Sequence, residues 1–309
     1  VLGPDGAPTL PTHWAFGQLA ARVSAPAGYL RQLPSDIAAD AINYGLAHRG
    51  IEDVGALLRM NEGPAPELAA LTGPNYGRVW NADVVGALQA KFGDGVTGDW
   101  TVPGEFGHAV DVTKDNTTLF ASDRDMFVFL ADETHRIEVP NRRNGQPGSL
   151  ARGFFVWNSE VGSTTLGIAT FLFDYVCCNR MVWGAQDFQE VRVRHTVSAP
   201  DKFLEQVQPA LVAYANSRAS GVQDAIMAAQ AAKIGDKDEV TEFLVKRRRF
   251  SQTQAQAINL AHMAEEGRPI ETLWDATVGI TAYAKGMKHQ DARVDLERKG
   301  GEVLTLATR

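Results

Sequence analysis

The sequence predicts an α+β fold in which a central antiparallel sheet is flanked by N-terminal helices and by a C-terminal helical region. Two observations lead to this prediction. Residues 106–198 contain short runs of apolar and β-branched residues separated by turn residues, as is typical of strands. Residues 1–105 and 199–309 instead show apolar residues at helical spacing, and helices grouped before and after strands indicate α+β rather than alternating βαβ. We expect the three regions to pack as one compact unit.

The N-terminal region is expected to consist of short helices. Thr12 stands where an N-cap is needed for the first helix, and Ser35 is expected to cap a second helix over residues 36–49. A third helix is predicted over Val79–Phe92, and the glycine-rich residues 93–107 then form a loop at the region boundary. This loop contains a G-x-G-x-x-G pattern, but a dinucleotide site needs a strand before it, and here a helical segment precedes it. We therefore interpret it as a loop only.

The central region is expected to carry the sheet and one exposed hairpin tip. Residues 141–153, NRRNGQPGSLARG, lie between predicted strands and are rich in Gly, Pro and Arg, so we expect them to project from the sheet. Residues 164–183 are apolar almost throughout, and we expect a mixture of strand and buried helix there because periodicity does not separate the two. Residues 190–197 alternate valine with arginine, as in a half-exposed strand. Beyond Ser198 the chain is expected to be helical, ending in a helix near residues 291–300.

Composition places limits on the partners and the compartment. The chain of 309 residues has a net charge of −7, which argues weakly against avid nonspecific nucleic-acid binding, although an acidic protein can still present a basic groove. Cys177 and Cys178 are adjacent, and we interpret them as buried free thiols in a reducing compartment. No apolar run reaches the roughly 18 residues that span a bilayer, and no secretory leader is recognisable. We expect a cytoplasmic protein with no membrane partner.

The sequence carries no catalytic signature. Ser163 follows a glycine but lacks the G-x-S-x-G pattern, and neither the histidines nor the cysteines have the spacing of a metal site, so we predict no metal and no cofactor. A metal-dependent nuclease or nucleotide-processing enzyme is the alternative, and it requires carboxylates that converge in space. The acids available for such a site are Asp111, Asp123, Asp125, Glu160 and Asp174.

Arginines around the expected hairpin tip are the main candidates for ligand contacts. Guanidinium groups match phosphate oxygens, and a basic hairpin can wrap a strand of nucleic acid while aromatic side chains stack on its bases. The competing interpretation, a solvated edge hairpin protected by its charges, is nearly as good. The candidate residues are Arg136, Arg142, Arg143, Arg152, Trp157 and Arg180.

A second basic run, Lys246–Arg249, precedes SQTQAQAINLAHMAEE. The two segments together fit a helix-turn-helix, although the end of a bundle helix, where cations favour the helix dipole, is the preferred interpretation.

A polar corner formed by Asn158, Ser159, Glu160 and Gly162 interrupts the apolar centre of the chain. Glu160 could serve as a catalytic acid, but side chains of this kind more often tie down a corner through hydrogen bonds to the backbone. A structural role is therefore favoured, and a functional role stays open.

Four segments resemble a known family. The segments are THWAFGQLAARVSAPAGYLRQLPSDIAADAINYGLA, TGPNYGRVWNADVVGAL, ARGFFVWNSEVGSTTLGIATFLFDYVCCNRMVWG and ETLWDATVGITAYAKGMKHQDARVDLERKGGEVL. In this order they resemble the phage/plasmid-like proteins grouped as domain of unknown function 932, although Arg180 stands where members often have glycine. The resemblance implies a gene carried on a phage, plasmid or other mobile element, and it implies neither an activity nor catalytic residues.

We therefore predict a non-enzymatic nucleic-acid-binding protein of a mobile element, with single-stranded DNA as the favoured partner. Strand protection or annealing in recombination or replication is the expected role. The predicted layout is similar to that of single-strand annealing proteins, an analogy of layout that leads us to expect a homo-oligomer. Besides the enzyme, a third possibility is a self-assembling or host-interaction protein that touches no nucleic acid.

Overall fold

The computed structural model describes most of the chain. The described residues are 8–49, 53–60, 63, 65–103, 119–140, 142, 145–175, 178–183, 190–216 and 221–308. Of the residues singled out in the sequence, Asp111, Arg143 and Cys177 lie outside these ranges.

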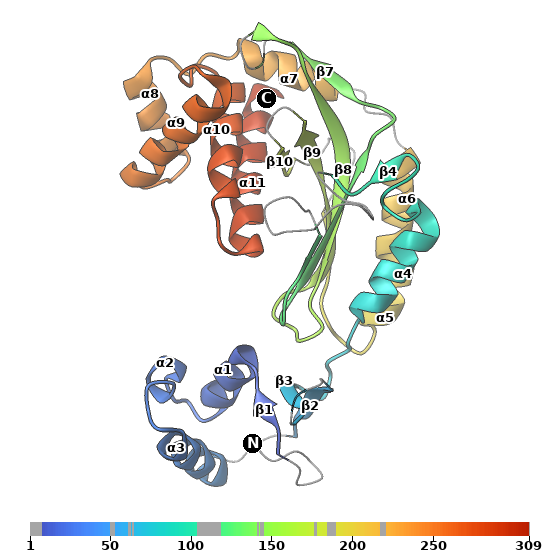
Figure 1. Ribbon diagram of the computed structural model, residues 1–309, viewed down its shortest axis with the longest axis vertical. Coiled ribbons are helices and arrows are strands. Elements are labelled where there is room, and N and C mark those ends of the chain that lie inside the picture. Colours follow the sequence, from blue (N-terminus) through green and yellow to red (C-terminus); the bar gives the residue numbers. More distant parts are fainter. Residues whose placement is uncertain are drawn as a thin grey trace.

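The N-terminal region combines three helices with a small sheet (Figure 1). The helices are α1 (His13–Arg22), α2 (Ala27–Leu30) and α3 (Ser35–His48), and the strands β1 (Leu10–Pro11), β2 (Gly55–Arg59) and β3 (Glu67–Thr72) lie in the order β1-β3-β2. The sheet was not expected, because β2 and β3 consist largely of leucine and alanine, which have high helix propensity. Pairing and burial override that propensity here.

Of the two predicted helix caps, the structure confirms one and contradicts the other. Thr12 caps α1 as predicted, since its Oγ1 accepts a hydrogen bond from the Ala15 N–H at 3.1 Å. The prediction for Ser35 is wrong: Ser35 is the first residue of α3, and Pro34 precedes it without a side-chain cap.

The main sheet is antiparallel at every described pairing, and helices lie on both of its faces (Figure 1). The strand order is β10-β9-β8-β6-β4, with β11 beside β9, β5 beside β6 and β7 beside β8. The strands are β4 (Trp100–Thr101), β5 (Leu119–Ala121), β6 (Met126–Asp132), β7 (Ile137–Val139), β8 (Gly148–Asn158), β9 (Leu166–Asp174), β10 (Asn179–Met181) and β11 (Val191–Val193). This architecture confirms the predicted α+β class.

The apolar segment 164–183 forms β9 and β10, and its described residues contain no helix, so the expected buried helix is wrong. Every residue of β9 is buried. A strand covered on both faces loses the alternation that marks a half-exposed strand, which is why periodicity could not identify it. Cys178, expected to be buried, is exposed in the connection between β9 and β10.

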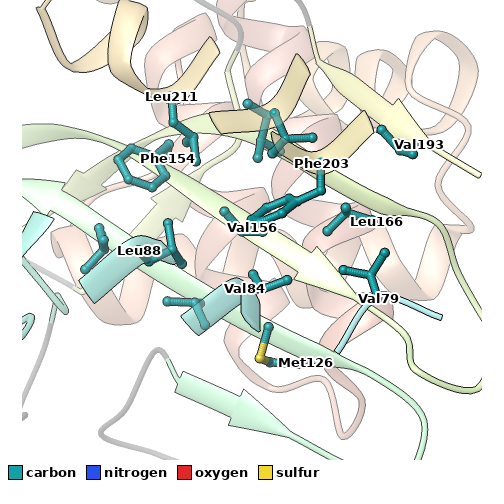
Figure 2. Close-up of a cluster of buried hydrophobic side chains, with 14 of the residues drawn as sticks. Val79, Val84, Leu88, Met126, Phe154, Val156, Leu166, Val193, Phe203 and Leu211 are labelled. Atoms are coloured by element: carbon teal, nitrogen blue, oxygen red, sulfur yellow. The ribbon is translucent and has the colours of Figure 1, made fainter. Parts of the chain in front are cut away.

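Side chains of β8 alternate between the two faces of the sheet. Phe154 and Val156 enter a cluster under α4 (Asn81–Phe92), α5 (Ala199–Lys202), the π-helical turn Phe203–Val207 and α6 (Gln208–Asn216), which Figure 2 shows. Phe155 and Trp157 enter an aromatic layer on the opposite face, where Val294 of α11 (Gln290–Thr305) joins them. Because α4 packs on this sheet, it belongs to the core of the sheet rather than to the N-terminal helices.

The C-terminal region is helical, as expected. It contains α7 (Val222–Ala231), α8 (Lys237–Glu242) continued by the π-helical turn Phe243–Arg247, α9 (Gln252–Glu266), α10 (Leu273–Lys285), α11 and the 3₁₀ turn Leu306–Thr308. Helix α11 continues beyond the expected end near residue 300, because Gly300 and Gly301 are packing positions within the helix and not its terminus.

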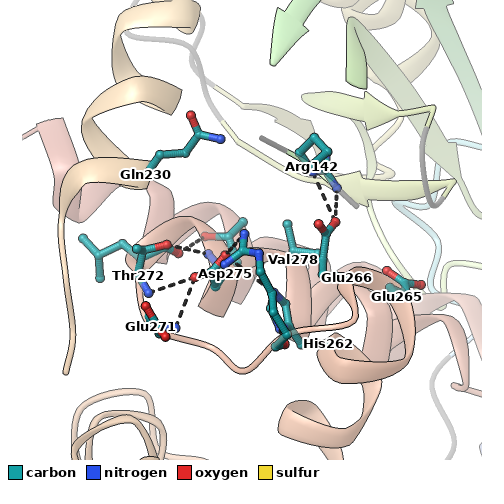
Figure 3. A network of polar contacts seen from close by, with 12 residues as sticks. Arg142, Gln230, His262, Glu265, Glu266, Glu271, Thr272, Asp275 and Val278 are labelled. Atoms are coloured by element: carbon teal, nitrogen blue, oxygen red, sulfur yellow. Dashed lines mark hydrogen bonds and ion pairs between the residues drawn. The ribbon is translucent and has the colours of Figure 1, made fainter. Parts of the chain in front are cut away.

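The first turn of α10 contains a buried carboxylate, that of Asp275. The Oδ2 atom of Asp275 accepts hydrogen bonds from the Glu271 and Thr272 N–H groups at 3.1 Å each, and Oδ1 lies 2.6 Å from the Arg268 guanidinium (Figure 3). Burial by itself raises the pKa of Asp275, but the interactions with His262 and Arg268 outweigh it and hold this pKa well below its ordinary value.

This depressed pKa makes stability depend on pH. The contribution of Asp275 is present above its unfolded-state pKa and is lost as pH falls toward the folded-state pKa. We expect the free energy of unfolding of the wild type to fall more steeply than that of Asp275→Asn between about pH 5 and about pH 2. Urea denaturation at a series of pH values measures this difference, and parallel curves for the two proteins would contradict the assignment.

Candidate functional site: an arginine–tryptophan pocket at one end of the sheet

Three of the arginines predicted to meet phosphates are buried and already paired. The Arg142 guanidinium lies 2.6 Å from both Asp174 Oδ2 and Glu266 Oε1. Both carboxylates are also buried, and the exposed fraction of the Arg142 side chain is 1%. The sequence interpretation of Arg142 as part of an exposed basic tip is therefore wrong, because the side chain points into the protein and joins the sheet to α9 (Figure 3).

Arg152 and Arg180 require the same correction. Arg152 Nε lies 3.3 Å from Asp132 Oδ2, and its exposed side-chain fraction is 7%. Arg180 is fully buried, pairs with Glu297 at 2.9 Å and stacks on Phe129. Burial lowers the pKa of Arg180 to about 10, which still leaves the guanidinium charged at neutral pH. These arginines stabilise the interior and are inaccessible to a phosphate.

The remaining candidates lie elsewhere. Arg136 stays at the surface, where it pairs with Glu133 and stacks on Tyr175. Trp157 is 4% exposed and belongs to the aromatic layer of the sheet, although its edge lines a pocket described below.

The polar corner holds the segment that leads into α4. Asn158 Nδ2 donates to Val79 O and Asn81 Oδ1 at 2.8 Å each, while Glu160 Oε1 accepts the Asn81 N–H at 2.7 Å. Glu160 also pairs with Arg78. The carboxylate thus caps α4 and has a structural role, in line with the favoured interpretation.

Two further residues complete the corner. Ser159 Oγ donates to Arg124 O at 2.5 Å and accepts the Ser163 N–H at 2.9 Å, which joins the corner to the turn between β5 and β6. Gly162 adopts φ +71°, where its missing Cβ would lie 3.0 Å from the Tyr76 ring. The Tyr76 hydroxyl donates to Glu160 O at 2.8 Å, and burial raises the pKa of Tyr76 to about 12, so this group is a neutral donor.

The contacts of the polar corner predict that a substitution of Glu160 lowers the free energy of unfolding. Glu160→Ala removes the cap of α4 and leaves Arg78 without its carboxylate, so we expect the free energy of unfolding to fall by about 1–3 kcal/mol. Glu242→Ala, which removes a carboxylate paired with the exposed Lys246, is the control and should cost less than about 0.5 kcal/mol. If chemical denaturation gave the two variants equal losses of unfolding free energy, a stabilising cap by Glu160 would be contradicted.

A pocket of about 290 Å³ opens beside this corner. Its lining residues come from α1, from one end of the main sheet and from α11, three parts of the chain that are distant in sequence. The lining residues are Trp14, Arg124, Asp125, Phe127, Trp157, Ser163, Thr164, Arg192, Asp291, Val294, Asp295 and Arg298. Three arginines and two tryptophans therefore meet at one opening, which we call the arginine–tryptophan pocket.

Arginines of the pocket lie over its tryptophans. The guanidinium carbons of Arg192 and Arg298 are 5.7 and 5.4 Å from the Trp157 ring centre, and that of Arg124 is 6.0 Å from Trp14. Trp14 is half-buried and donates its Nε1–H to Val161 O at 3.3 Å, which fixes α1 against the corner. Cation–π contacts of this kind orient the guanidinium groups at the mouth of the pocket.

The lining of the pocket carries three arginines and three aspartates, and its ion pairs are unevenly distributed. Arg192 and Arg298 both lie 2.8 Å from the same oxygen, Glu190 Oε1, so one carboxylate serves two guanidinium groups. Asp295 is a more distant partner, 3.5 Å from Arg298. Among the described contacts Arg124 has no ion pair.

Of the carboxylates proposed for a metal site, those within the described ranges do not come together, and Asp111 lies outside these ranges. Glu160 is engaged by Arg78 and α4, Asp174 by Arg142, and Asp125 by the Ser122 hydroxyl at 2.7 Å. Within the described ranges no three His, Cys, Asp or Glu side chains form a group that could hold a metal ion.

The residues of the pocket carried only partial signals in the sequence. Arg192 was recognised as the exposed side of an alternating strand, but nothing connected it with Trp14 or with Arg298. These residues meet because Trp14 of α1 bonds to Val161 in the corner after β8, while Val294 of α11 packs on the aromatic layer of the sheet.

The fold and the pocket together define a class: an α+β protein whose helix-covered antiparallel sheet carries an arginine–tryptophan pocket at one end. The chain belongs to the family described as Domain of unknown function (DUF932), whose model matches residues 109–301, more than half of the chain. This match confirms the resemblance found in the sequence. All the pocket residues except Trp14 fall inside the matched range. No curated protein and no solved structure matches the chain.

One further structural finding concerns membranes. In the part of the chain that is described, none of the helices is both long and apolar enough to cross a bilayer.

Proposed function

We propose that the protein binds single-stranded nucleic acid, with the arginine–tryptophan pocket holding one nucleotide unit of the strand. The observation that carries the proposal is the meeting of Arg124, Arg192 and Arg298 with two tryptophans at one opening. Binding to single strands combines phosphate contacts from cations with stacking on aromatic rings. The pocket offers both, and its volume of about 290 Å³ suits a small ligand group.

The cations of the pocket are suited to a phosphate. Arg192 and Arg298 share Glu190, so a phosphate can pair with one guanidinium without leaving the carboxylate unpaired. The side chain of Arg192 is also more than half exposed, at 55%, and so is accessible to a strand. Charge-assisted bonds from a guanidinium fork to phosphate oxygens are among the strongest polar contacts in proteins.

The other polar groups of the pocket are suited to a base. Asp125 and Asp291 provide acceptors and Ser163 a hydroxyl, and carboxylates accept hydrogen bonds from the amino groups of bases. A ligand that carried only negative charge would be repelled by these acids. A nucleotide, which has an anionic phosphate and a base with donor groups, fits the mixed lining better than a simple anion does.

Fluorescence anisotropy with a labelled single-stranded oligonucleotide tests the proposal across a salt series. We expect the double variant Arg192→Ala/Arg298→Ala to bind about tenfold or more weakly, and the slope of log K against log salt to fall by about 1. Trp14→Leu is expected to weaken binding at every salt concentration without changing the slope, because it removes a stacking surface and no charge.

Lys91→Ala/Lys237→Ala is the matched control, because it removes two exposed cations remote from the pocket. The control should bind like the wild type. Two results would each sink the proposal: a wild type that does not bind single strands at low salt, or a pocket variant that binds as well as the control.

The finer parts of the sequence prediction stay predictions. Carriage on a phage, plasmid or other mobile element, a role in annealing or recombination, and a homo-oligomeric state are expectations that the proposed binding accommodates. The assembly or host-interaction alternative predicts an oligomer whose mass is insensitive to nuclease and salt.

A further inference from the structure

A second surface, remote in sequence from most of the pocket, has the form of a helix-turn-helix. Helix α8 and its π-helical continuation end at Arg247, four residues follow, and α9 begins at Gln252. A capping box fixes this start: Ser251 Oγ accepts the Gln254 N–H at 3.1 Å, and Gln254 Oε1 accepts the Ser251 N–H at 2.9 Å.

The two helices share one core with α10. Their buried side chains meet those of α10 in a single cluster, so the unit is supported from behind as a three-helix arrangement. The buried residues that α8, α9, α10 and their connections contribute to this cluster are Val240, Phe243, Leu244, Phe250, Ala255, Ile258, Ile270, Ala276, Ile280 and Ala284. Two helices joined by a turn of three to four residues are the geometry used for insertion into the major groove of DNA.

The outer face of α9 is exposed and uncharged. Gln252, Thr253 and Gln256 are exposed on its N-terminal half, and their side chains make no hydrogen bond within the described residues. Leu260 and Met263 are exposed further along. From residue 252 to residue 264 the sequence contains no Asp, Glu, Lys or Arg. A solvent-facing helix surface without charge leaves its glutamines free to bond to an external partner.

Two cations that make no ion pair among the described residues border this face, although Arg247 also acts electrostatically on Glu242. In the described part of the chain Lys246 pairs with Glu242 and Arg248 lies 3.8 Å from Glu302, whereas the exposed Arg247 and Arg249 make no ion pair. Arg249 has φ 58°, a left-handed conformation in which glycine is the usual residue. A long cationic side chain is thus placed beside the start of α9, at a position where its backbone is unfavourable.

We propose that the outer face of α9 docks in the major groove of double-stranded DNA, with Arg247 and Arg249 on the phosphates. Residues at the N-terminal end of such a helix contact base edges, and glutamine pairs with adenine through two hydrogen bonds. DNA fits better than RNA, because the deep and narrow major groove of an RNA duplex does not admit a helix.

Charge complementarity favours DNA over a second copy of this chain. Residues 252–264 of α9 contain no Asp or Glu, so the same face of a second copy would offer Arg247 and Arg249 no carboxylate. The phosphates on either side of a groove would pair them. The exposed Leu260 and Met263 make a second copy the competing occupant, and the experiment separates the two.

The test is anisotropy of a labelled DNA duplex of roughly 20 base pairs, about two helical turns, across a salt series, with light scattering on the same samples. We expect Arg247→Ala/Arg249→Gly to bind duplex about tenfold or more weakly and to lower the salt slope by about 2, with unchanged binding of single strands. Glycine at residue 249 suits the left-handed backbone, so folding is preserved. Gln252→Ala/Gln256→Ala should weaken the wild-type preference among duplex sequences with an unchanged slope, because these side chains carry no charge.

Lys233→Ala/Lys237→Ala removes two exposed cations, one at the start of α8 and one four residues before it, and should bind duplex like the wild type. The pocket variant Arg192→Ala/Arg298→Ala should lose single strands and keep duplex, so failure at one site is distinguishable from failure at the other. The proposal is overturned if the wild type does not bind duplex, or if the Arg247/Arg249 variant binds duplex normally. It is also overturned if that variant changes the oligomer mass measured by light scattering and leaves the affinity for duplex unchanged, since α9 would then contact a second copy.

Discussion

Arg142→Met is expected to lower the free energy of unfolding by about 3–5 kcal/mol, because it leaves two carboxylates buried without their cation. Asp174 at the end of β9 and Glu266 at the end of α9 each lie 2.6 Å from the guanidinium, and both side chains are at most 1% exposed. The arginine also lies over the Trp274 ring, 5.2 Å from its centre. Chemical denaturation monitored by tryptophan fluorescence measures the loss.

Two comparisons separate the loss of a buried cation from the loss of a side chain. Arg136→Met removes an arginine from an ion pair that is about half exposed on the arginine side, and we expect it to cost no more than about 1 kcal/mol. The triple variant Arg142→Met/Asp174→Leu/Glu266→Met replaces the whole group by apolar side chains and should recover most of the stability. A single variant as stable as the Arg136 control would contradict the buried pairing.

Gly301→Ala is the second change for which we expect a large effect. A Cβ at this position would lie 2.0 Å from the carbonyl oxygen of Val182, which is backbone and cannot move aside as a side chain can. Helix α11 must therefore shift away from the segment after β10, which would also disturb the Val182 N–H to Glu297 O hydrogen bond. We expect a loss of about 2–3 kcal/mol in the free energy of unfolding, measured by thermal and chemical denaturation.

Gly86→Ala in α4 is the matched control. This glycine is also inside a helix, but it is exposed and a Cβ there would meet nothing within 4 Å. The same substitution should stabilise the protein by about 0.5–1 kcal/mol, because alanine lowers the entropy of the unfolded chain. Opposite signs for the two variants are the expected result, and stabilisation by both would mean that close packing of α11 does not explain Gly301.

These two contacts also bear on the proposed binding sites. Gly301 allows α11 to approach the sheet, and α11 supplies Arg298 to the arginine–tryptophan pocket. Arg142 joins the sheet to the C-terminal end of α9, the helix whose outer face we propose to meet duplex DNA. A variant that loosens either contact is therefore expected to weaken binding indirectly, which is why the binding tests change residues outside these two contacts.

Several parts of the fold could be predicted from local sequence. Alternation in residues 190–197 predicted β11, the helical stripe before Gly93 predicted α4, and Thr12 predicted the start of α1. Each of these signals depends on neighbours a few residues away. The small N-terminal sheet and the strand nature of β9 escaped prediction, because both follow from which layers cover a segment and not from its own pattern.

The sequence alone determined the α+β class and the family, because these depend on local periodicity and on motifs that each lie in one stretch of chain. It also identified arginines as candidates for ligand contacts, but it could not distinguish buried arginines from exposed ones. Only the tertiary structure decided that Arg142, Arg152 and Arg180 pair with acids 20 to 124 residues away, and that Arg192 and Arg298 stay at a pocket mouth. Burial and ion pairing are properties of contacts between distant segments, and a guanidinium has the same local sequence signature whether its partner is a carboxylate of its own chain or a phosphate.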